Sequence, residues 1–152
     1  MMQPFVRRFL RASLVWFGVG VVIGVSMAFA PPTLAYRPAH VHANLLGFVS
    51  MMIFGVAYHV IPRFTGNPLH RPALATAHLW IANLGLSLIV AGWIGRVWAA
   101  GPGTIAVRLG AALSAAGAAL FIYNIWRTLG PAVRSTTCKS TLPISSARVS
   151  TR

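Results

Sequence analysis

Residues 37–63 read RPAHVHANLLGFVSMMIFGVAYHVIPR, an almost unbroken apolar run between an Arg-Pro pair and a Pro-Arg pair. The run from His42 to Ile61 has about the 20 residues that an α-helix needs to cross a bilayer. Histidines stand near its two ends, at positions 42 and 59. The stretch therefore predicts a membrane-spanning helix that carries imidazole groups toward both membrane faces.

Three other apolar stretches extend this prediction to the whole chain. The 152 residues are 57% hydrophobic, and spans are expected over about 12–30, 42–61, 73–97 and 104–126. Short connections favour antiparallel neighbours, so we expect an all-α integral membrane four-helix bundle with up-down topology. Prolines predict a loop over residues 31–39 and an end of the second helix at Pro62. Small residues recurring along the helices, such as Gly20 and Gly24, predict close helix packing.

The two ends of the chain differ in composition from the spans. Residues 1–130 are expected to form the four-helix domain, and the Ser- and Thr-rich basic segment 131–152, with the single cysteine Cys138, is expected to be a disordered cytoplasmic tail. A basic start followed by Ala28-Phe29-Ala30 also resembles a signal peptide. However, the apolar run is longer than such a segment needs, and Pro31 follows directly.

The charge is one-sided, at a formal net +13 with no aspartate or glutamate. Basic residues gather before the first span, in the loop over 62–72 and after the fourth span, so the positive-inside rule predicts that both termini are cytoplasmic. The expected partner is a bilayer with anionic headgroups, in a bacterial inner (cytoplasmic) membrane. Nucleic acid is not expected as a partner, because the basic residues lie at helix ends rather than in one patch.

The absence of carboxylates leaves imidazole as the main source of polar chemistry within the spans. Acid–base pairs and Ser-His-Asp arrangements are excluded. Ionisable side chains within a membrane usually mark a function, and neutral imidazole is a ligand for iron. His40, His42, His59 and His78 are therefore candidate ligands, whereas His70, in a polar loop, is expected to be solvated. Ser50 and Ser114 are expected to make hydrogen bonds between helices.

One part of the second span resembles a known family. His42-Ala43-Asn44-Leu45-Leu46, followed by Phe54-Gly55, Tyr58 and Pro62, is similar to the second transmembrane helix of subunit I of the heme-copper oxidases. The similarity is greatest to the C-type cytochrome oxidases and the large subunit of nitric oxide reductase. It is strong over residues 37–63 and weaker over 78–85. The resemblance implies that His42 is an axial ligand of a heme b near the outer membrane face.

The same resemblance also limits the expected activity. The family carries its second heme ligand and its copper-site histidines on later helices, which these 152 residues do not include, and it uses acidic residues that this sequence lacks. We therefore expect no copper site and no catalytic residues. Whether the chain takes part in an enzyme is left open by the sequence.

Spacing decides which histidines can share one iron. His42 and His59 are about 25 Å apart along one helix, at 1.5 Å per residue, so they cannot bind the same iron. An antiparallel turn would bring His59 and His78 to a similar depth, which predicts an intrachain bis-histidine heme site. His42 would take its second ligand from another subunit, in a homodimer or an oxidase-like complex, or from no protein group at all.

The other cofactor-binding candidates have simpler alternatives. His40 is either a polar residue at headgroup level or a ligand. Arg37 and Arg63 either pair with heme propionates, since guanidinium matches carboxylate geometry, or only anchor the helix ends.

Together these features predict a membrane b-type cytochrome-like protein for respiratory electron transfer or heme and nitric oxide handling, without its own oxygen-reducing centre. The alternative is a heme-free scaffold or an assembly or accessory subunit of an oxidase-like complex.

Overall fold

Residues 2–130 form four long apolar helical segments, and each is long enough to cross a membrane. A computed structural model describes residues 2–130, which are helical almost throughout and contain no strand. The elements are α1 (Pro4–Phe29), the 3-10 helix η1 (Pro31–Tyr36), α2 (Arg37–His42), the π-helix η2 (Ala43–Ser50), α3 (Met51–Thr65), α4 (Pro72–Gly95) and α5 (Ala100–Thr128). The predicted tail over 131–152 and Cys138 lie outside the described residues.

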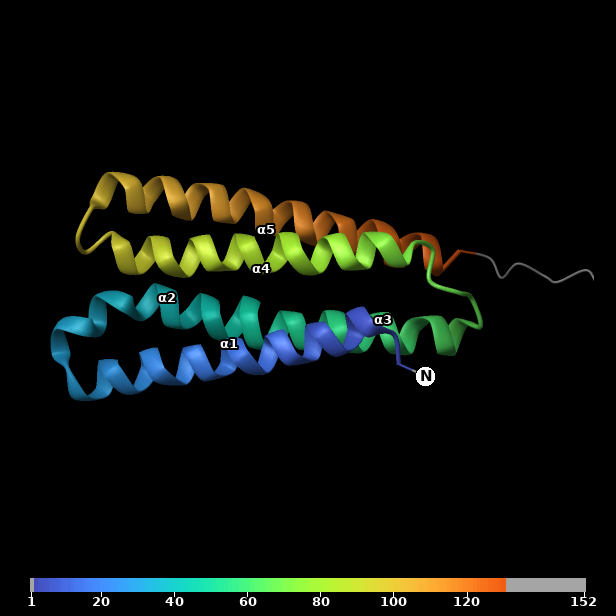
Figure 1. Cartoon of the computed structure of the whole chain (residues 1–152), viewed down its shortest axis with the longest axis horizontal. Helices are drawn as coiled ribbons and strands as arrows, with labels where there is room; N and C mark the ends of the chain where they lie inside the picture. The colour runs from blue at the N-terminus through green and yellow to red at the C-terminus, as the bar shows by residue number, and fades with distance from the viewer. Residues whose placement is uncertain (1, 131–152) are drawn as a thin grey trace, which may run out of the picture.

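Two helical hairpins lie side by side in the bundle (Figure 1). In the first hairpin, α1 packs against the segment formed by α2, η2 and α3, and in the second, α4 packs against α5. Contacts within each hairpin run in opposite chain directions: Gly20 lies against Asn44, whereas Phe9 lies against Gly55. The predicted all-helical membrane bundle is therefore confirmed, and its paired helices are antiparallel.

Glycines allow α4 and α5 to approach closely. A Cβ atom built on Gly85 would lie 2.9 Å from the Gly110 carbonyl oxygen, and one on Gly92 would lie 2.8 Å from the Gly103 carbonyl oxygen. Such distances are too short for any side chain. Small residues therefore pack the helices within this one chain, as the sequence predicted.

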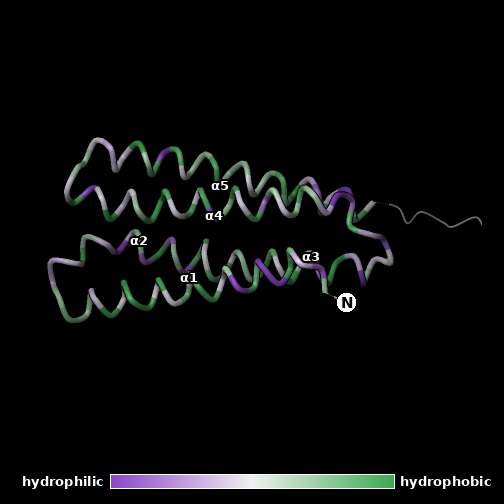
Figure 2. The backbone as a smooth tube through the Cα atoms, in the orientation of Figure 1, coloured by the Kyte–Doolittle hydropathy of each residue, from purple (hydrophilic) through white to green (hydrophobic). Residues whose placement is uncertain are grey.

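The outer surface of the bundle is apolar. Figure 2 shows hydrophobic residues along every helix, and large side chains such as Val22, Ile53 and Leu109 are more than half exposed in the isolated chain. Because these residues lie on helices of membrane-spanning length, they contact lipid or another membrane protein. The chain is therefore an integral membrane protein.

The second membrane segment is longer than predicted. Residues 31–39 do not form a loop, because η1 and the start of α2 occupy them, and helical structure continues over Pro31–Thr65. Pro62 lies inside α3 rather than at its end. A proline removes only one helical hydrogen bond, and the chain continues to Gly66, whose φ of 70° ends the helix in the left-handed conformation.

The π-helix η2 changes which residues share a face. In a regular α-helix, seven residues from His42 to Val49 complete about two turns and return to the same face. Hydrogen bonds in a π-helix span five residues, so each residue turns the chain less. Val49 and Ile53 are accordingly 41% and 56% exposed, whereas Leu46 and Phe54 line an interior cavity.

Candidate histidine sites

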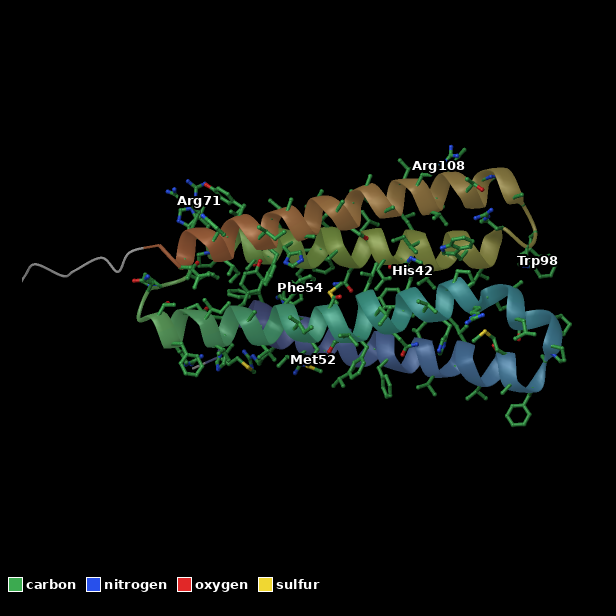
Figure 3. All side chains as sticks on the ribbon, turned by 180° about the vertical axis from the view of Figure 1, so that it is seen from behind. His42, Met52, Phe54, Arg71, Trp98 and Arg108 are labelled. Atoms are coloured by element: carbon green, nitrogen blue, oxygen red, sulfur yellow. The ribbon has the colours of Figure 1, made fainter. Side chains whose placement is uncertain are left out.

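His42 stands at the end of α2, on the half of the molecule that contains the α4–α5 turn (Figure 3). Its imidazole is half-buried, and Nδ1 lies 2.7 Å from the Pro38 carbonyl oxygen. A carbonyl only accepts hydrogen bonds, so Nδ1 carries the proton and Nε2 carries the lone pair. Metal-ligating histidines characteristically make this hydrogen bond through the nitrogen that does not bind the metal.

His40 is committed to packing between α2 and α1. Its Nδ1 lies 2.8 Å from the Gly20 carbonyl oxygen, and its Cε1 would be 2.9 Å from a Cβ atom on Gly24. The neighbouring Asn44 fills the space beside Gly20. The Gly20–Gly24 pair thus receives two polar side chains, and the His40 ring joins the helices of the first hairpin.

His59 lies at the opposite end of the bundle, where it interacts with Arg63. An Arg63 guanidinium nitrogen is 2.6 Å from the His59 ring nitrogens and 3.1 Å from the His59 carbonyl oxygen. Guanidinium only donates hydrogen bonds, so Arg63 donates to the His59 carbonyl oxygen and packs closely against the imidazole ring. Both residues line an open pocket of about 500 Å³, bounded on one side by Phe5.

His78 is the most deeply buried of the candidate ligands, with no exposed surface. Its Nδ1 lies 3.2 Å from the Tyr58 hydroxyl oxygen. Phe9, Phe54 and Phe121 surround the ring, with centroid distances of 5.1, 4.6 and 5.7 Å. This aromatic enclosure joins α1, α3, α4 and α5 around one imidazole.

The α3 residue that hydrogen-bonds to His78 is therefore Tyr58 rather than His59. The sequence predicted the right depth for the α3 partner of His78, because Tyr58 and His59 are adjacent residues. It predicted the wrong residue, because His59 lies on a different part of the helix surface. The cavity beside His78 has a volume of about 60 Å³, whereas pockets for drug-sized ligands have roughly 300–1,000 Å³. As folded, His78 has no room for a porphyrin.

The remaining polar candidates lie near the ends of the bundle. Arg37 is exposed at the first residue of α2. His70 is half-buried in the α3–α4 loop, where its ring meets Tyr123 at a centroid distance of 5.8 Å, so it is less solvated than expected. No group of three or more histidine, cysteine or acidic side chains is close enough to hold a metal ion within residues 2–130.

The fold and these side chains define a helical membrane protein whose candidate cofactor ligands are single histidines. Comparison with known proteins agrees with this class. Residues 5–146 match the family model described as cytochrome c and quinol oxidase polypeptide I. The chain belongs to this family, and the predicted resemblance to subunit I of the heme-copper oxidases is confirmed.

Individual relatives come from bacteria. The chain is 30% identical to the cbb3-type cytochrome c oxidase subunit CcoN1 of Stutzerimonas stutzeri, in an alignment that covers 80% of this chain and 32% of the relative. It is 28% identical to cytochrome c oxidase subunit 1 of Rhodobacter capsulatus, in an alignment that covers 59% of this chain and 22% of the relative. It is 26% identical to the bacteroid cytochrome c oxidase subunit 1 homolog of Bradyrhizobium diazoefficiens, in an alignment that covers 82% of this chain and 28% of the relative. The chain thus spans about a third or less of the length of these relatives.

Proposed function

We propose that this chain is a membrane cytochrome-like protein that binds one heme b through His42 Nε2 and serves single-electron transfer. The observation that carries the proposal is the 2.7 Å contact of His42 Nδ1 with the Pro38 carbonyl oxygen. It fixes the tautomer and orients the ring in the way that metal-ligating histidines require. A heme bound there would supply one-electron redox chemistry, with its potential tuned by the axial ligands and the burial.

The chain's own residues would hold the heme at one edge. Arg37 begins the helical segment that contains His42, and the sequence offers no acidic side chain to pair with it. Its guanidinium is therefore available for a propionate carboxylate, which it would bind bidentately. A second protein ligand, where one is needed, would come from a second copy of the chain in a homodimer or from a larger oxidase-like complex, because His42 is only half-buried.

The alternative heme sites have weaker support. The Arg63 guanidinium packs closely against the His59 ring, and His78 is buried beside a cavity of about 60 Å³. We propose that Arg63 acts with the other arginines at its end of the bundle, Arg7, Arg8 and Arg71, on anionic headgroups. By the positive-inside rule, we propose that this end of the bundle faces the cytoplasm of a bacterial cell, in the inner membrane.

Reduced-minus-oxidised absorption spectra of the detergent-purified full chain test this proposal. We expect a b-type heme signal that His42→Ala abolishes. The matched control is His70→Ala, which removes a half-buried loop imidazole and should leave the heme signal unchanged. If His42→Ala retains the heme content and spectrum of the unmodified chain, the assignment to His42 is wrong. If the unmodified chain, expressed with sufficient heme, carries none, the heme-free scaffold or accessory role replaces the cytochrome function.

A further inference from the structure

A small, partly open cavity lies at the junction of the two hairpins, and the heme proposal does not use it. Its volume is about 60 Å³. Met51 and Phe54 line it from α3, His78 from α4, and Ser114 and Ala118 from α5. Most of the lining is apolar, and its polar members are His78, Ser114 and Ser50, whose hydroxyl donates to the Leu45 carbonyl oxygen at 2.8 Å.

Two buried polar atoms at this cavity have no protein partner within residues 2–130: His78 Nε2 and Ser114 Oγ. The sequence predicted that Ser114 would bond to another helix, and the structure contradicts this. Tyr58 occupies the other nitrogen of His78, at 3.2 Å. Whichever tautomer the ring adopts, Nε2 still has a proton to donate or a lone pair to offer.

The size and polarity of the cavity select its ligand. A water molecule needs about 10–15 Å³ of such volume and two to four polar partners, whereas cavities that stay empty are apolar. Because an unsatisfied buried polar group is costly, two such atoms at one cavity favour occupancy. We propose that the cavity binds water and that one water molecule bridges His78 Nε2 and Ser114 Oγ.

The bridging water completes a polar connection between helices of different hairpins. The connection runs from Tyr58 on α3 through the His78 ring on α4 and the water to Ser114 on α5. Neighbouring apolar walls, Phe54 and Phe121 among them, surround His78. The water site therefore fixes the orientation of an imidazole that joins both hairpins, and it does so whether or not the chain binds heme.

Two measurements on the full chain in detergent micelles test the site. The first is magnetisation transfer from water to the His78 ring, assigned with nitrogen-15 histidine labelling and the His78→Gln variant. The second is xenon binding, which detects dry apolar cavities. We expect a water signal at His78 and no saturable xenon binding. Saturable xenon binding without a water signal at His78 would overturn the proposal.

A cavity-filling variant and its matched control make the test specific. Ala118→Leu places a side chain in the cavity and should abolish the water signal while the Tyr58–His78 contact persists. Ala119→Leu adds the same atoms at an exposed position on α5 and should keep the signal. If the signal survives in Ala118→Leu with a preserved fold, the water that contacts His78 lies outside this cavity and the proposal is wrong. Loss of the signal in Ala119→Leu as well would equally refute the assignment.

Discussion

The close approach of α4 and α5 predicts that Gly110→Ala destabilises the bundle, although it adds only one methyl group. The new Cβ atom would lie 2.5 Å from the Gly85 carbonyl oxygen and 2.8 Å from the Ile89 backbone nitrogen. Both obstacles are backbone atoms of α4, which cannot rotate away. The two helices must therefore move apart along their contact.

The size of the effect follows from that movement. Restoring van der Waals distances requires a shift of roughly 0.5–1 Å, and a gap of that size forfeits about a quarter to a half of each contact energy. Overpacking of this kind typically costs about 1–3 kcal/mol. Helix propensity offsets little, because helices in a membrane environment persist when their tertiary contacts are lost. We therefore expect a loss of about 2 kcal/mol in the free energy of unfolding.

Titration of the micelle-bound protein with a denaturing detergent measures this loss through tryptophan fluorescence. Trp93 on α4 and Trp126 on α5 lie on the two affected helices. The control is Gly18→Ala in α1, where a Cβ atom would meet no other atom within 4 Å, so its effect should stay within about 0.5 kcal/mol. The reasoning is refuted if Gly110→Ala unfolds at the same detergent fraction as Gly18→Ala.

Three further changes test other contacts. Tyr58→Phe removes the hydroxyl that bonds His78 at 3.2 Å and should lower the unfolding free energy by about 1–3 kcal/mol; an unchanged titration midpoint would contradict it. Asn124→Leu removes a side chain that bonds both the backbone nitrogen and carbonyl oxygen of Arg71 at 3.0 Å, so the Arg71 amide should exchange with solvent faster; retained protection would count against this. Gly66→Ala forces a side chain into a φ of 70° and should cost about 1–2 kcal/mol; a gain in stability would show that the turn conformation is wrong.

Apolar runs predicted the number and order of the spans but not their limits. Hydropathy reports which residues fit the bilayer core, whereas a helix extends as far as its backbone hydrogen bonds continue. α1 therefore begins at Pro4, ahead of the predicted residue 12, and carries Arg7, Arg8 and Arg11 on its first turns. Pro31 and Pro38 start helical segments rather than a loop, since proline is well suited to the first turn of a helix.

Side-chain orientation was harder to predict, because it depends on small changes in helix phase. The His59–His78 pairing rested on depth alone, yet adjacent residues of a helix point about 100° apart, and Tyr58 meets His78 instead. A regular α-helix would place Val49 on the same face as His42. The π-helix η2, for which the sequence offers no clear signal, redirects Val49 to the exterior.

Polar contacts distribute unevenly between the two ends of the bundle. At the end that carries the α3–α4 loop, the Asn67 side chain donates to the Thr128 and Gly130 carbonyl oxygens at 3.1 and 2.9 Å, which satisfies the last turn of α5. Asn124 adds two hydrogen bonds to the loop. At that end, side chains of this chain therefore satisfy the backbone groups of the loop and of the last turn of α5.

At the His42 end, the His40 ring joins α2 to α1 through the Gly20 carbonyl oxygen at 2.8 Å. The Arg96 guanidinium stacks over the Trp93 ring, 4.6 Å from its centroid. The buried Trp93 Nε1 has no hydrogen-bond partner within residues 2–130. With no carboxylate in the sequence, neither Arg37 nor Arg96 can form an ion pair with an acidic side chain. Unused donors thus gather at the same end as His42 Nε2. A carboxylate-bearing cofactor would satisfy these donors and the imidazole together, whereas lipid phosphate would satisfy only the donors.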